Sequence, residues 1–99
     1  MDAGGAAGFA VVDAEGRIAS ADRHVEQITG KTAAELVGQP ITSIAPGSRA
    51  GVHVEQRFGA VHANVSLSLD ARMAVFQDMT RSELELVRAR DRLDFALAS

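Results

Sequence analysis

The chain has 99 residues, a mass of 10.4 kDa and a net charge of −3 from 13 acidic and 10 basic side chains. A chain of this length forms one domain around a single core. A nucleic-acid surface binds phosphates through clustered lysine and arginine and stacks unpaired bases on aromatic rings. The net negative charge of this chain and its small number of aromatic residues, four, argue against such a surface. It has no cysteine, which excludes disulfides and thiolate metal ligands.

No apolar stretch approaches the ~20 residues that a membrane-spanning helix needs. The first residues carry no basic group before an apolar run, so they do not form a signal peptide. We therefore expect a cytoplasmic domain, alone or as the cytoplasmic part of a larger protein, without direct membrane contact. Residues 1–7 are assigned to a disordered lead-in.

The first elements in the chain are two short strands. Residues 8–12 form a continuous apolar run, and residues 17–20 form a second short segment. Between them, Asp13 and Gly16 occupy the first and last positions that a type I turn favours. This pattern predicts a hairpin.

Two small helices follow in tandem. Asp22 is placed to cap the first, and Gly30 stands where a left-handed residue ends it. Thr32 and Glu35 have the spacing of a capping box, in which each side chain accepts from the other residue's backbone N–H. Gly38 then closes the second helix. Residues 41–51 are predicted to form one helical turn and a loop.

From residue 52 to residue 69 the apolar side chains alternate with polar ones, with an interruption at residues 59–60. A two-residue turn at the interruption would place Val54 opposite Val65, and both strands would then direct their apolar side chains to one face. The sequence therefore predicts an antiparallel pair in a defined register.

The last strand, residues 72–77, is predicted to place Met73 and Val75 on one face and Phe76 on the other. It leads directly into a second Thr-x-x-Glu pattern, Thr80 and Glu83, which predicts the start of a helix. No flexible residue separates strand from helix, so a displacement of the sheet can pass to whatever follows. Asp78, Thr80 and Glu83 are the candidate signal-transmission residues.

The predicted C-terminal helix, residues 81–99, carries a narrow apolar stripe. Its members are Met79, Leu86, Leu93 and Leu97. The stripe is similar to the start of a coiled-coil seam but covers under three heptads, too few to define one. Two alternatives remain open: the helix pairs with that of a second copy, or it packs on its own sheet.

The order of these elements resembles that of PAS domains. Residues 8–18 resemble the opening "vvD-x-x-G-x-I" hairpin of the family, residues 30–38 its "tG-x-x-x-x-ElvG" helices, and residues 78–80 its Asp-Ile/Val-Thr ending. The resemblance implies an α+β fold: a five-stranded antiparallel sheet in the order 2-1-5-4-3 with short helices on one face. The domain would span residues 8–80.

The resemblance also implies a function. PAS domains are sensory and dimerisation modules of signal-transduction proteins, and they do no chemistry themselves. We therefore expect a homodimer joined through the C-terminal segment to an effector in the same chain. That effector would be a histidine kinase of a two-component system, a cyclic-dinucleotide synthase or another PAS domain.

The sequence departs from the family pattern in its middle. The segment at residues 46–52 is too short for the longer helix that walls the ligand pocket in many relatives. Haem-binding relatives take their iron-ligating histidine from that helix, and flavin-binding photosensors use a cysteine. We therefore expect no haem, no flavin and no other cofactor.

Two binding roles remain open. The domain either holds a small metabolite in a reduced pocket or acts only through protein contacts. Six residues are predicted to line that pocket or simply to form the core: Val12, Ile28, Leu36, Ile44, Val65 and Val75.

An enzyme is the least favoured reading, because no catalytic group converges with another. His53 and His62 would lie on one face but ~13 Å apart along their strands, too far to share a metal.

Overall fold

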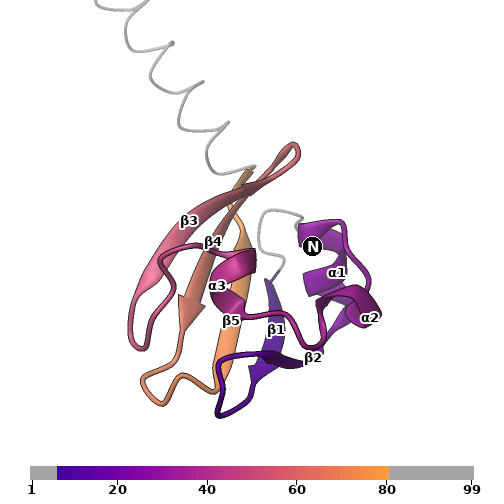
Figure 1. The fold of residues 1–99 in the computed structure, drawn as a ribbon. Coiled ribbons are helices and arrows are strands. Elements are labelled where there is room, and N and C mark those ends of the chain that lie inside the picture. Colours follow the sequence, from indigo (N-terminus) through magenta and orange to yellow (C-terminus); the bar gives the residue numbers. More distant parts are fainter. Residues whose placement is uncertain (1–6, 81–99) are drawn as a thin grey trace, which may run out of the picture.

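The computed structural model describes residues 7–80. In this part of the chain, five antiparallel strands form one sheet in the order β2-β1-β5-β4-β3, and three short helices pack on it (Figure 1). The elements are β1 (Ala7–Val12), β2 (Ile18–Ala21), α1 (Arg23–Thr29), α2 (Ala33–Leu36), α3 (Ile41–Ile44), β3 (His53–Phe58), β4 (Val61–Leu67) and β5 (Met73–Asp78). The predicted α+β class and strand order are confirmed.

The first strand begins one residue earlier than the sequence predicts. Ala7, assigned above to the lead-in, is the first residue of β1 and pairs with Gln77 of β5. The rest of the lead-in lies outside the described residues. The same holds for the predicted helix at residues 81–99, with Glu83, Leu86, Leu93 and Leu97.

The N-terminal hairpin forms as predicted because Asp13 organises its turn. One oxygen of the Asp13 carboxylate accepts the backbone N–H groups of Glu15 and Arg17, both at 2.9 Å. Gly16 follows with φ of 79°, a conformation that costs glycine little. The contacts that form this turn join residues at most four apart, so their spacing could be recognised in the sequence.

Both small helices are capped as the sequence predicts. The Asp22 carboxylate accepts the N–H of Val25 at 3.0 Å, and Gly30 ends α1 with φ of 75°. In α2, the Thr32 hydroxyl accepts the N–H of Glu35 at 3.2 Å, and the Glu35 carboxylate accepts the N–H of Thr32 at 2.8 Å. The hydrogen bonds from the Thr32 backbone and hydroxyl lower the pKa of Glu35, because they favour the charged carboxylate.

Helix α1 is fixed directly to the first strand. The second carboxylate oxygen of Asp22 accepts the N–H of Phe9 at 3.0 Å, so one side chain both caps α1 and binds β1. The helix start also lies very close to Gly8. A Cβ atom on Gly8 would lie 2.5 Å from the backbone nitrogen of Val25, closer than real Cβ atoms approach. Gly8 therefore sets how closely α1 packs on the sheet.

The β3–β4 register is the one predicted from the alternation. Val54 lies opposite Val65 and Phe58 opposite Val61, with Gly59 in the turn at φ of 64°. Residues 45–52 form a bend, turns and irregular chain, and they contain no helix.

The core lies between the helices and one face of the sheet. Its buried side chains include five of the six candidate core or pocket residues, Val12, Ile28, Leu36, Ile44 and Val65. The assignment of Val75 to the core is wrong. In β5, Ala74 and Phe76 face the helices with no exposed surface, and Val75 therefore points to the opposite face.

The sequence offered apolar residues on both faces of β5, and packing decides between them. On the helix side, Gly8 lies opposite Phe76 and Ala10 opposite Ala74. These small residues leave room beside the Phe76 ring, which also packs against Phe58 with ring centroids 6.3 Å apart. Phe76 therefore fills the core.

Candidate functional site at the end of the last strand

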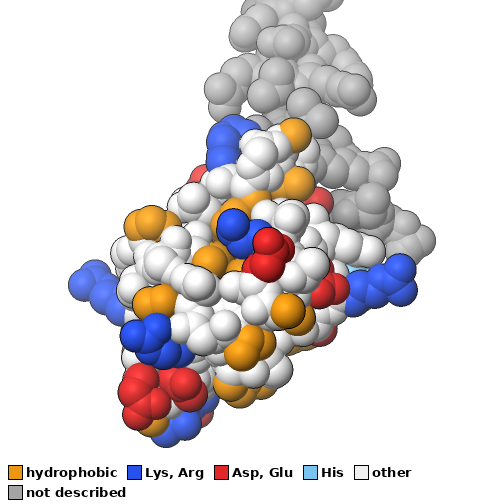
Figure 2. All heavy atoms as spheres, turned by 45° about the vertical axis from the view of Figure 1, so that its right-hand side comes forward, with side chains coloured by type: hydrophobic (Ala, Val, Ile, Leu, Met, Phe, Trp, Pro, Cys, Tyr) orange, Lys and Arg blue, Asp and Glu red, His pale blue; other side chains and the backbone are white. Residues whose placement is uncertain are grey.

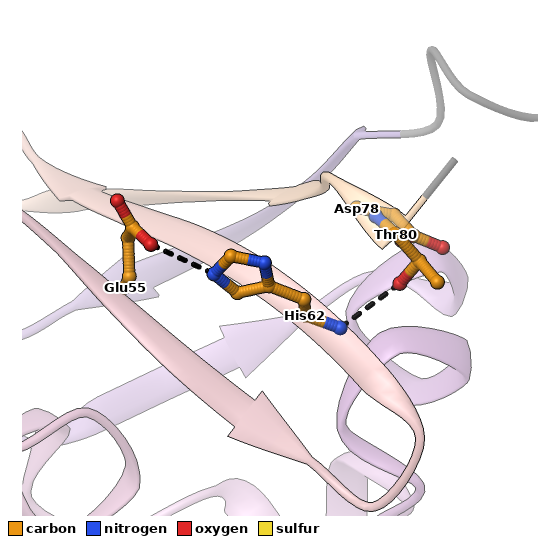
Figure 3. Close-up of polar contacts among 4 residues, drawn as sticks. All are labelled: Glu55, His62, Asp78 and Thr80. Carbon is orange, nitrogen blue, oxygen red and sulfur yellow. Dashed lines mark hydrogen bonds and ion pairs between the residues drawn. The ribbon is translucent and has the colours of Figure 1, made fainter. Parts of the chain in front are cut away.

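The end of β5 is hydrogen-bonded to a single residue of β4. The backbone N–H of Met79 donates to the carbonyl oxygen of His62 at 2.7 Å, which adds one bond beyond the end of the strand. In return, the N–H of His62 donates to the Thr80 hydroxyl oxygen at 2.9 Å (Figure 3). Both backbone polar groups of His62 thus bind the two residues that follow β5. We call His62, Asp78, Met79 and Thr80 the junction clasp.

Asp78 completes the clasp from its own strand. Its carboxylate accepts the backbone N–H of Thr80 at 2.9 Å, the contact of an aspartate two residues before a helical amide. Thr80 is already helical in conformation. Asp78 therefore supplies an acceptor where the strand ends and the following segment begins.

Thr80 has a role that the capping box did not predict. Thr80 stands three residues before Glu83, as the predicted box requires, but its hydroxyl oxygen accepts a hydrogen bond from the backbone N–H of His62 in the sheet. Glu83 lies outside the described residues, so the predicted box stays a prediction. The contact with His62 follows from the β4–β5 register, in which Ala63 lies opposite Asp78. Extending that register by one pair would have placed His62 beside Met79.

The side chain of His62 extends the clasp toward the edge of the sheet. Its Nε2 lies 2.8 Å from Oε1 of Glu55 on β3, and Figure 3 shows the ring directed toward that carboxylate. The His62 side chain is 15% exposed and that of Glu55 is 68% exposed, so solvent weakens the contact. Arg57 lies directly opposite His62, and His53 lies opposite Ser66, which confirms that the two histidines are far apart in register.

A second feature lies among the helices. A surface hollow of about 470 Å³ is lined by Lys31, Glu35, Gln39, Ser43 and Ile44. Of the six candidate pocket residues, Ile44 lines it. Figure 2 looks toward the helix side of the molecule and shows acidic and basic side chains scattered over this face with small hydrophobic areas between them.

Residues 7–80 contain no cluster of three or more histidine, cysteine, aspartate or glutamate residues able to hold a metal ion. This part of the chain also contains no helix long and apolar enough to cross a membrane.

The protein is thus an α+β domain in which hydrogen bonds from β4 and from Asp78 hold the two residues that follow the last strand. Comparison of the sequence with models of known protein families gives no match, and comparison with curated proteins gives none either.

Proposed function

We propose that the chain is a PAS-like sensory and dimerisation module of a signal-transduction protein. A displacement of the sheet passes through Asp78, Met79 and Thr80 to the C-terminal segment and from there to an effector domain. By resemblance, the effector is a histidine kinase, a cyclic-dinucleotide synthase or a further PAS domain. The module does no chemistry, binds no haem or flavin and works in the cytoplasm.

The observation that carries this proposal is the junction clasp. His62 belongs to β4, an inner strand of the sheet, and its N–H and C=O both bind residues beyond the end of β5. Neither Met79 nor Thr80 is a glycine, so the backbone that follows β5 has little freedom to absorb a movement. A shift of β4 against β5 must therefore break the clasp or move Thr80 with it.

The test replaces Thr80 by valine, which has nearly the same shape but no acceptor for the His62 amide. Hydrogen exchange at the His62 amide should become faster, and signal-dependent output of the complete parent protein should change. Thr80→Ser keeps an acceptor and should restore both. Thr42→Val on the exposed side of α3 is the control.

Two outcomes count against the proposal. The transmission role is wrong if Thr80→Val speeds exchange at His62 but leaves the output of the parent protein unchanged. It is also wrong if Thr42→Val changes the output as much as Thr80→Val, because the effect would then not come from the clasp.

The surface hollow supports one alternative, a small-metabolite sensor. Its volume of about 470 Å³ is in the range of small-molecule sites, and it offers a lysine, a carboxylate and an apolar wall at Ile44. Native mass spectrometry of the purified protein should then detect a bound small molecule that is lost in Ser43→Trp, which fills the hollow. Polypeptide mass alone, or a ligand that Ser43→Trp retains, would reject this alternative.

A further inference from the structure

Strand β3 forms one edge of the sheet. It is the last strand in the order, so among the described strands it has a neighbour, β4, on one side only (Figure 1). At the other edge, the chain itself covers the start of β2. The N–H of Ile18 donates to the carbonyl oxygen of Gln39 at 2.9 Å, and the N–H of Gly38 donates to that of Ile18 at 2.8 Å. An edge strand offers a row of backbone donors and acceptors to a further strand, and β3 is therefore a surface for strand pairing.

The junction clasp shows which backbone groups of β3 point outward. Both backbone polar groups of His62 bind residues beyond the end of β5, so they point away from β3. Arg57 lies opposite His62, and the two therefore form a non-hydrogen-bonded pair in which the N–H and C=O of Arg57 point away from β4. Because the two kinds of pair alternate along a ladder, the N–H and C=O of Glu55 point outward as well.

We propose that the β3 strands of two copies of this chain pair antiparallel at this edge and join the two sheets into one. The inference rests on the dimerisation role in the proposed function and names a surface for it. A two-fold axis beside Gln56 places Glu55 of each copy opposite Arg57 of the other. Both residues direct their backbone groups outward, so each Glu55–Arg57 pair exchanges two hydrogen bonds.

Charge selects this register among its neighbours. Unlike charges directly opposite each other stabilise a pair of strands, and like charges destabilise it. An axis beside Glu55 would place two carboxylates together, and an axis beside Arg57 would place two guanidinium groups together. The axis beside Gln56 gives two pairs of unlike charge. The Glu55 side chain is 68% exposed, so it stays accessible to the second copy beside its contact with His62.

The helix side of the same register pairs apolar residues. Val54 and Phe58 are partly buried against the core, and the axis beside Gln56 places Val54 of each copy opposite Phe58 of the other. An aromatic residue opposite a β-branched one stabilises a pair of strands. The motif that a partner strand needs, an acid and a base two residues apart between two apolar residues, is thus the motif of β3 itself.

The length of the contact sets its strength. Gly59 begins the turn after Phe58, so the pairing covers residues 54–58 and buries less than the ~800 Å² per partner of a stable complex. We expect a dissociation constant of roughly 0.1–1 mM. Domains tethered in a longer assembly reach effective concentrations of about 1 mM, at which such a contact forms.

The experiment measures association of the full chain by sedimentation equilibrium up to about 1 mM. Glu55→Arg makes both charges of the register positive, and Arg57→Glu makes both negative. Each variant alone should raise the dissociation constant by about 10-fold or more, because two attractive pairs per dimer become repulsive. An equimolar mixture should associate like the wild type again, because each variant attracts the other. Restored association would also show that both variants are folded.

Two exposed residues on other elements provide matched controls. Arg23→Glu and Glu15→Arg change the net charge by the same amounts as the test variants. Each alone should associate like the wild type, and mixing them should add nothing. If Arg23→Glu weakens association as much as Arg57→Glu does, the effect comes from net charge and the proposed surface is wrong.

Hydrogen exchange locates the contact in the wild type. The amides of Glu55 and Arg57 should become protected as the concentration rises, whereas those of Val54 and Gln56, which face β4, should exchange slowly throughout. A wild type that stays monomeric up to about 1 mM would overturn the proposal. So would a mixture that associates no better than its components. Protection of Glu55 and Arg57 in a monomer would also overturn it, because the chain's own segment would then cover the edge.

These results separate the edge contact from the proposed function. Association of the charge variants reports only on β3, whereas the Thr80→Val experiment reports on transmission. If Thr80→Val changes output but the charge variants associate like the wild type, the edge contact alone is rejected. If the mixture restores association but Thr80→Val leaves output unchanged, the transmission role alone is rejected.

Discussion

Gly8→Ala should destabilise the domain far more than a single methyl group normally does. Gly8 has no positive φ, so the glycine is required by the close approach of α1 and not by its backbone conformation. The added Cβ would lie 2.5 Å from the Val25 nitrogen and 2.9 Å from a carboxylate oxygen of Asp22. Helix α1 would have to move away from β1, which strains the packing and weakens the two hydrogen bonds of Asp22.

The expected cost combines both effects. Overpacking of this kind costs about 1–3 kcal/mol, and weakening the Asp22 bonds to Phe9 and Val25 adds about 1 kcal/mol. We therefore expect the free energy of unfolding to fall by about 2–4 kcal/mol, which lowers the melting temperature of a domain this small by roughly 10–25 °C. Urea denaturation followed by circular dichroism gives the free energy, and a thermal scan gives the temperature.

Gly59→Ala is the control for this prediction. Gly59 has φ of 64° and no atom near the position of an added Cβ, so its replacement costs only the left-handed backbone conformation, about 1–2 kcal/mol. Two results would show that the close approach of α1 does not require glycine at position 8. One is a smaller loss of stability in Gly8→Ala than in Gly59→Ala. The other is a loss in Gly8→Ala of less than about 0.5 kcal/mol, which is typical of surface substitutions.

Two further predictions concern the faces of β5 and the response to acid. Phe76→Ala should cost about 3–5 kcal/mol in urea denaturation and Val75→Thr under about 1 kcal/mol, because Phe76 fills the core and Val75 lies on the outer face; equal costs would contradict this assignment. The pKa of Glu35 is lowered by hydrogen bonds from Thr32, and that of Asp70 by hydrogen bonds from the Ser68 hydroxyl and the Arg72 amide. Their contribution to stability is therefore present above the unfolded-state values of 4.5 and 3.8 and is lost as pH falls through the lower folded-state values. Unfolding free energies measured from pH 6 to pH 2 should fall less steeply in Glu35→Gln combined with Asp70→Asn, and an unchanged slope would refute this.

The features that the sequence predicts well depend on contacts between near neighbours. The Thr32–Glu35 box and the Asp22 cap each join residues three apart, so their side-chain types and spacing contain all the information needed. The β3–β4 register follows in the same way, because a two-residue turn leaves one alignment that puts Val54 and Val65 on one face.

The features that the sequence does not predict depend on residues far apart in the chain. Val75 and Phe76 are both apolar, and Phe76, which enters the core, lies opposite Gly8, almost seventy positions earlier. The bond between His62 and Thr80 joins residues 18 apart through the pairing of two strands. The residue pattern of a single strand cannot predict either contact, because each contact depends on how two strands pair.

The pairing of β1 with β5 has a mechanical consequence. The first and last strands lie side by side in the middle of the sheet, with Ala7 opposite Gln77, so the start of β1 and the end of β5 lie at the same end of their ladder. A pull on the segments that flank the domain would therefore load the β1–β5 ladder at one end and open it one pair at a time, instead of shearing its five pairs together. Tension between neighbours in a longer chain would peel the domain open at low force, starting beside the clasp.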